Sequence, residues 1–254
     1  LGIFGAGLAT AICQPASFTI LTTMSRKFGV MKLSLRNCRP DVLLMREVAG
    51  GGLPSLIRQG AGSISVTCVN IAANPFGDAA IAAMSVVNRY SNFLICVGLG
   101  IGQGFQPVAS FNYQARKYDR VKKGLVFTMC FGLVFIGSFS VISMICAEGI
   151  IGIFQKSEAV IAIGSTALRY TAIGMLFFPF SVPVNMLYQS IQQPTISSVL
   201  SLIRSGAVTI PMLLIGVPLL GLPGIQIAQP TADVIAGLLS IPFIIRFLRK
   251  TPAE

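Results

Sequence analysis

The sequence predicts an all-α polytopic membrane protein with seven transmembrane helices. Hydrophobic residues make up 54% of the 254 residues and charged residues only 11%, whereas soluble globular domains carry roughly 25% charged residues. The mean hydropathy is +0.79. The apolar residues also fall into runs close to the roughly 20 residues with which a helix crosses a bilayer. A soluble domain is therefore excluded.

The apolar runs are separated by short polar or glycine- and proline-containing segments. The predicted spans are residues 2–22, 50–73, 79–109, 125–147, 161–186, 196–220 and 225–247. Pro15 interrupts the first run, but membrane helices tolerate proline when neighbouring groups satisfy the freed carbonyl. Residues 41–49 are predicted as a short surface helix before the second span, and residues 148–158 as an external loop.

The basic residues predict how these spans are oriented. Thirteen of the nineteen Lys and Arg residues fall in three segments: residues 25–40, the loop after the third span and the C-terminal tail. If seven spans alternate, all three segments lie on the same side, which the positive-inside rule makes the cytosol. The net charge of +11 therefore follows membrane topology, and we expect membrane lipid rather than nucleic acid as a partner.

The cysteines and the first residues exclude other classes of site. Six cysteines are scattered without a C-x-x-C pair, and there is no histidine. Cysteine in an apolar span usually acts as a small hydrophobic residue, so we expect neither a disulfide nor a metal. The chain begins with Leu1, and no basic segment or cleavage site precedes the first apolar run. We interpret that run as a membrane span rather than a signal peptide, and the chain as a fragment.

The most specific sequence pattern lies between Ala79 and Lys123. An apolar run leads into Gly98-Leu99-Gly100-Ile101-Gly102-Gln103-Gly104-Phe105-Gln106-Pro107, and then into Asn112-Tyr113-Gln114-Ala115-Arg116-Lys117-Tyr118-Asp119-Arg120-Val121. This stretch resembles the multidrug and toxic compound extrusion (MATE) transporters. In that family a helix of each half ends with a similar Gly-Gln-Gly-x-Gln-Pro followed by an Asn-Tyr-Gly-Ala-x-x-x-x-Arg-Val-type run. Gln114 stands where the family usually has glycine.

The resemblance implies two six-helix bundles joined by a cytosolic linker around a central cavity. Residues 1–24 would be the last helix of the N-terminal bundle, residues 25–40 the linker and residues 41–254 the C-terminal six-helix bundle. The rest of the N-terminal bundle would be missing from this chain. The implied function is proton- or sodium-coupled antiport of amphipathic, often cationic compounds across the plasma membrane by alternating access. The substrate would lie between the bundles near the bilayer midplane, and no cofactor would be needed.

Charged side chains inside the predicted spans are the first candidates for function. Each costs roughly 2.5–3.5 kcal/mol at the centre of a membrane helix, so each should face protein or water. These residues are Arg58, Arg89, Arg169, Arg204 and Asp233. From their depths we expect Asp233 to face the bundle interior, paired with Arg169 or Arg89. Arg58 and Arg204 would extend to the cytosolic interface.

The resemblance also bears on which carboxylate would bind the proton or sodium ion that drives transport, the coupling carboxylate. Some MATE branches carry such a carboxylate in each of the helices that correspond to residues 50–73 and 161–186, but neither span contains an acid here. The coupling carboxylate would then lie in the missing bundle, or it is Asp233. As a structural alternative, Asp233 makes an ion pair or hydrogen bond inside the bundle.

Uncharged polar residues in the spans are candidates for lining a substrate cavity. They are Gln59, Asn70, Asn88, Asn92, Asn185, Tyr188 and Gln189. Hydrogen bonding between helices is the alternative for each. Met175, Phe177, Phe178 and Phe180 offer either a surface for aromatic cations or ordinary packing. Gly98 and Gly102 have the spacing of a close helix–helix contact.

Two other functions are weighed against antiport. A related flippase or exporter of lipid-linked saccharides would prefer an arginine-lined cavity, which the arginines inside the spans allow. A membrane enzyme, such as an acyl or glycosyl transferase, is disfavoured because the spans hold no histidine and no paired acid–base constellation. We therefore expect a transporter and no enzyme.

Overall fold

The structure is a computed structural model that describes residues 2–28 and 41–250. These residues are almost entirely helical and contain no strand. They divide into two compact units, Leu1–Glu47 and Val48–Glu254. The predicted all-α fold is therefore confirmed.

The first unit contains α1, which runs from Gly2 to Phe28 with Pro15 inside it. The helix ends four residues beyond residue 24, where the first segment was predicted to end, so residues 25–28 of the predicted linker are helical. Residues 29–40 of that linker lie outside the described residues. Large apolar side chains of α1 are exposed along the helix, and Phe18 is 72% exposed. An exposed apolar surface of this kind is typical of a helix that faces lipid or another helix.

Helix α2 runs without a break from Val42 to Ala73. The prediction of a separate surface helix over residues 41–49 is wrong. The glycines at 50–52 do not end the helix because each disfavours helix by only about 1 kcal/mol relative to alanine. Pro54 lies inside the same helix.

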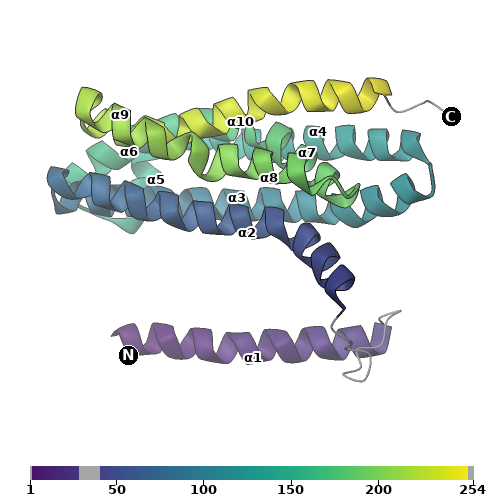
Figure 1. Cartoon of the computed structure of the whole chain (residues 1–254). Coiled ribbons are helices and arrows are strands. Elements are labelled where there is room, and N and C mark those ends of the chain that lie inside the picture. Colours follow the sequence, from purple (N-terminus) through teal and green to yellow (C-terminus); the bar gives the residue numbers. More distant parts are fainter. Residues whose placement is uncertain (1, 29–40, 251–254) are drawn as a thin grey trace. The chain divides into compact units, whose positions relative to one another are not determined.

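Within the second unit the long helices lie side by side (Figure 1). The elements after α2 are the 3₁₀ turn η2 (Asn74–Phe76), α3 (Asp78–Gln114), α4 (Tyr118–Ile145), α5 (Ala147–Phe154), α6 (Glu158–Met175), α7 (Phe178–Ser190), α8 (Pro194–Leu202), the π-helical turn η3 (Ile203–Ala207), α9 (Thr209–Leu220) and α10 (Leu222–Lys250). Helix α10 packs against α6, α7 and α9, and α3 packs against α4, α6 and α7.

Four helical segments in the described part of the chain are long and apolar enough to cross a membrane. They are α3, α4, the segment Pro194–Leu220 that contains α8, η3 and α9, and α10 up to Arg249. Helices α6 and α7 add a fifth if the pair, bent by 49°, forms one span. A membrane protein with several spans is thus supported, whereas the count of seven stays a prediction.

Two segments differ from their predicted structure. The predicted external loop at residues 148–158 contains α5, whose Ile151 is fully buried; the apolar residues after Glu148 gain this burial by folding as a helix. The predicted continuous span at 161–186 breaks between α6 and α7. Pro179 lies in the first turn of α7, where it has no N–H to donate back to the preceding helix.

The glycines of α3 fix its contact with α7. A Cβ atom on Gly98 would lie 2.3 Å from Cε1 of Phe178, and one on Gly102 would lie 2.8 Å from Cγ1 of Val182. A Cβ atom on Gly100 would meet nothing within 4 Å. The predicted close contact at Gly98 and Gly102 is therefore confirmed, and it holds the first turns of α7 directly against α3.

Candidate functional site

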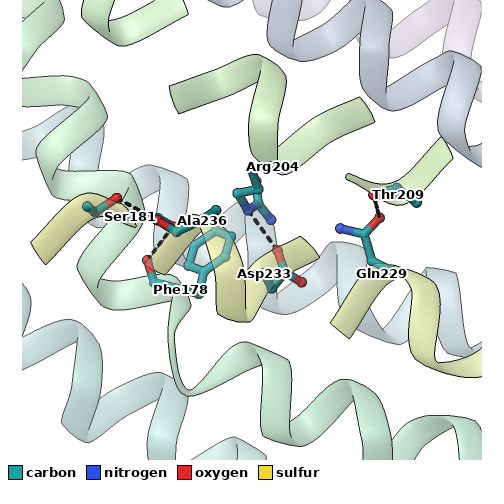
Figure 2. A network of polar contacts seen from close by, with 8 residues as sticks. Phe178, Ser181, Arg204, Thr209, Gln229, Asp233 and Ala236 are labelled. Atoms are coloured by element: carbon teal, nitrogen blue, oxygen red, sulfur yellow. Dashed lines mark hydrogen bonds and ion pairs between the residues drawn. The ribbon is translucent and has the colours of Figure 1, made fainter. Parts of the chain in front are cut away.

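The most buried charged contact that the structure gives is an ion pair between α10 and η3. Asp233, on α10, is 1% exposed, and its Oδ1 accepts a hydrogen bond from Nε of Arg204 at 2.9 Å (Figure 2). The Arg204 side chain is 11% exposed. The prediction that Asp233 is buried and pairs with a basic residue is confirmed. The identity of that residue was predicted wrongly: it is Arg204, and neither Arg169 nor Arg89. The prediction that Arg204 extends to the cytosolic interface is also wrong.

The π-helical turn presents Arg204 to α10. A π-helical turn holds an extra residue, widens the helix and leaves a carbonyl without its usual partner, and such turns are frequent at functional sites. Here Ser65 of α2 donates its hydroxyl to the carbonyl of Ser205. At the end of the turn, Thr209 donates to Oε1 of Gln229 on α10 at 3.3 Å (Figure 2). The widened turn is thus anchored on α2 and on α10.

Arg204 also contacts the break between α6 and α7. Its guanidinium carbon lies 4.3 Å from the centroid of the Phe178 ring, and Phe178 is 1% exposed. A guanidinium over an aromatic face at this distance is attracted by the ring, more strongly when water is excluded. Phe178 and Met175 therefore serve the core rather than an open aromatic surface, while Phe177 and Phe180 are half-buried.

A small cavity lies beside the ion pair. Its empty volume of about 290 Å³ includes the open space at its mouth, and the space that can hold the centre of a water molecule is only about 20 Å³, room for about one water. Its lining residues come from α2, α3, α7, α8 and η3: Arg58, Leu99, Ser181, Val182, Asn185, Met186, Leu200, Ser201, Arg204 and Ser205. The cavity thus combines two arginines, several hydroxyls and an apolar wall.

Asn185 is the predicted amide that lines this cavity. Its Nδ2 donates to the carbonyl of Ser197 at 2.7 Å and to Oγ of Ser201 at 2.8 Å. Its Oδ1 accepts from the hydroxyl of Ser197 at 3.1 Å. The side chain therefore joins α7 to α8 as well as facing the cavity.

Tyr188 and Gln189 bond to neighbouring helices instead of lining the cavity. The hydroxyl of Tyr188 donates to the carbonyl of Phe243 on α10 at 3.2 Å. Nε2 of Gln189 donates to the carbonyl of Gly51 on α2 at 3.0 Å. For these two residues the structure favours helix–helix bonding over a cavity role.

The remaining predicted residues do not line this small cavity, and their place in the predicted cavity between two bundles stays a prediction. Gln59, Asn70, Asn92 and Arg89 are exposed, and Asn88 is half-buried. Arg169 pairs with Glu148 at 3.2 Å in an exposed contact, the two side chains being 48% and 69% exposed. Glu148 lies on α5, which the sequence had placed in a loop, so this pair was not foreseen.

The sequence contained a signal for the pair of Arg204 with Asp233. Each lies about eight residues from an opposite end of its predicted span. At 1.5 Å per residue both residues are about 12 Å deep in a core about 30 Å thick. Because the two depths are measured from opposite faces, the two Cα atoms differ in depth by only about 6 Å, which a long arginine side chain spans. The serines at 181, 201 and 205 carried no comparable signal.

Metal chemistry has no visible site in the part of the chain that the structure describes. No three His, Cys, Asp or Glu side chains gather there. The described cysteines, at positions 13, 68, 96, 130 and 146, are free.

A protein-family model named MatE matches residues 54–215, nearly two thirds of the chain. The chain belongs to the MatE family. The matched segment contains α3, α7, η3 and the cavity. The resemblance noted between Ala79 and Lys123 is thereby confirmed.

The curated relatives are named multidrug export proteins. The chain is 24% identical over 250 residues to the multidrug export protein MepA of Staphylococcus saprophyticus, covering 98% of this chain and 55% of that protein. It is 23% identical over 252 residues to MepA of Staphylococcus aureus strain NCTC 8325, with the same coverage. The chain thus spans about half the length of these relatives. Because the relatives are transporters, the alternative of a membrane enzyme is set aside.

Solved structures share the fold. A MATE structure in complex with MaL6 superposes with a TM-score of 0.85 at 20% identity, over 97% of this chain and 57% of that one. An outward-facing multidrug resistance MATE transporter superposes with a TM-score of 0.85 at 19% identity, over 98% and 57%. At these identities the likeness concerns the fold alone.

We predict that Asp233→Asn destabilises the protein far more than Asp119→Asn. Removing one charge of a buried pair leaves the other uncompensated, at about 3–5 kcal/mol. Asp119 lies in the first turn of α4, where losing an acid should matter by about 0.3–1 kcal/mol. Thermal unfolding of the purified variants in detergent measures the difference.

The exposed pair of Arg169 with Glu148 is the matched control. Because exposed pairs contribute roughly 0–1 kcal/mol, Arg169→Gln should unfold close to wild type. If Asp233→Asn also unfolded close to wild type, Asp233 would leave the candidate site.

Proposed function

We propose that this chain is the C-terminal half of a secondary active multidrug exporter of the MatE family. The transporter would exchange protons or sodium for amphipathic, often cationic compounds by alternating access in the plasma membrane. The observation that carries the proposal is the match of nearly the whole chain to 55% of multidrug export proteins. No cofactor is invoked.

The proposed domain organisation follows from the same half-length match. Residues 1–24 would be the last helix of the N-terminal bundle, residues 25–40 the cytosolic linker and residues 41–254 the C-terminal six-helix bundle. The division into units at Glu47 and Val48 supports a boundary near residue 41. The remainder of the N-terminal bundle would be this chain's structural partner.

We also propose that Asp233 is not the main coupling carboxylate. Its Oδ1 already bonds Arg204, so a proton or sodium ion would have to compete with a guanidinium for the same charge. Oδ2 makes no hydrogen bond of ordinary geometry in the described residues, which leaves one oxygen for a secondary role. The coupling carboxylate would then belong to the N-terminal bundle.

A flippase or exporter of lipid-linked saccharides is the second candidate. The observation that favours it is the cavity lining, which contains Arg58 and Arg204 but no acid. Such a lining suits a phosphate-bearing substrate better than a cation. Export of a cationic dye would decide against this candidate.

The first prediction of the proposal concerns topology. In a background without native cysteine, Cys at Asn74 or Lys156 should react with a membrane-impermeant thiol reagent from outside, and Cys at Lys117 only from inside. These positions are exposed and avoid the positive-φ glycines 77 and 221, where cysteine would be strained. Reaction of the Lys117 variant from outside would overturn the topology.

The second prediction is that this chain alone does not transport. Substrate in a two-bundle transporter lies between the bundles, and one bundle leaves that face incomplete. Ethidium accumulation in cells without their own pumps should fall with the full-length gene product that contains this chain, and should not fall with residues 1–254 alone. Lowered accumulation from the chain alone would contradict the two-bundle account.

A further inference from the structure

Arg58 is the one arginine at the cavity that makes no hydrogen bond through its buried nitrogens. Nε and Nη1 of Arg58 are both buried, and neither has a hydrogen-bond partner in the described residues. The side chain projects from α2 into the same cavity as Arg204. The residue as a whole is half-buried, but a buried N–H group without an acceptor is costly, so these two nitrogens favour a ligand that accepts hydrogen bonds.

The surroundings of Arg58 offer hydrogen-bond donors but no negatively charged group. No acid lines the cavity, and the nearby acid, Asp233, is already bonded to Arg204. The hydroxyl of Ser201 accepts a hydrogen bond from Asn185, which leaves its proton to donate. Ser181 differs, because its hydroxyl donates to the carbonyl of Phe178.

The apolar wall gives this cavity a second character. Leu99, Met186 and Leu200 line the cavity together with Arg58. The space inside the cavity, about 20 Å³, has room for about one water molecule, so only the tip of a head group enters it, and any apolar stem lies at its mouth.

We propose that the anionic head group of an amphipathic molecule binds at the mouth of this cavity, with Arg58 as the main charged contact. A carboxylate, sulfonate or phosphate would accept hydrogen bonds from the Arg58 fork, which matches the planar geometry of such groups. Ser201 would supply a further donor. The proposal rests on the proposed export function and extends its substrate class to anionic and zwitterionic amphiphiles. An anionic lipid head group shares the same chemistry.

The experiment measures binding to the purified full-length gene product in a neutral detergent. The probe is taurocholate, an amphipathic sulfonate, and the readouts are its Kd and the melting temperature of the protein. Taurocholate should raise the melting temperature of the wild type, because a ligand that binds only the folded state stabilises it. Arg58→Gln should raise the Kd at least about tenfold, the loss expected for one charge-assisted hydrogen bond.

The same variants separate a binding role from a structural one. Without ligand, Arg58→Gln should melt at or above the wild-type temperature, since it removes two buried nitrogens that have no hydrogen-bond partner in the described residues. Arg58→Lys keeps the charge without the fork, so its Kd should be intermediate. Arg89→Gln, which removes an exposed arginine away from the cavity, should bind like wild type.

The lipid source is distinguished in nanodiscs. If phosphatidylglycerol raises the wild-type melting temperature relative to phosphatidylcholine, and Arg58→Gln abolishes that rise, the site binds a lipid head group. If only taurocholate raises the melting temperature, and Arg58→Gln abolishes that rise, the site binds a substrate head group. Equal Kd values for the wild type, Arg58→Lys and Arg58→Gln would overturn the proposal. So would a wild type that responds to no anion, which is the result expected if an acid of the N-terminal bundle pairs with Arg58.

Anion binding and ethidium export are measured separately. The readout is binding, so it stays interpretable if the full-length protein exports no ethidium. Conversely, ethidium export without any effect of Arg58 on anion binding would leave the export function in place and remove only the anion site.

Discussion

The contact between Asp233 and Arg204 joins most of the irregular features of the second unit. A carboxylate that is 1% exposed in an apolar bundle requires a charged or hydrogen-bonded partner. Arg204 meets that requirement from a π-helical turn, while its guanidinium lies over Phe178 at the start of α7. The turn is held in addition by Ser65 of α2. One ion pair therefore ties α10, the widened turn and the α6–α7 break to one another.

Irregular helices of this kind are expected where a transporter binds or moves. Backbone that departs from the α-helix at membrane depth is tolerated only where protein or a water-filled cavity satisfies it, and broken helices commonly form transporter binding sites. In this chain α7, which follows the break, and the π turn both border the arginine-lined cavity. The tight contact of Gly98 and Gly102 with α7 holds one wall of that cavity in place. The irregular backbone and the two arginines thus meet at one place in the described bundle.

Local sequence patterns predicted the helices, but not where they bend or which residues pair. Run length and composition located α3, α4 and α10, and glycine spacing located the contact of α3 with α7. The π turn adds one residue to a helix without changing its composition, so it left no pattern. Partner choice depends on how α10 and η3 are rotated about their axes, which depth alone does not specify; Arg169 and Arg89 matched Asp233 in depth but face elsewhere. Helix α5 was missed because its eight residues are too few to show a span.

A double-mutant cycle on Asp233 and Arg204 measures whether the two side chains interact. The four proteins are wild type, Asp233→Asn, Arg204→Gln and the double variant, and the measurement is the free energy of unfolding in detergent. Direct contact predicts non-additivity of about 1–3 kcal/mol, with the double variant less destabilised than the sum of the single ones. Additivity to within about 0.5 kcal/mol would show that the two side chains do not interact, and would contradict the account.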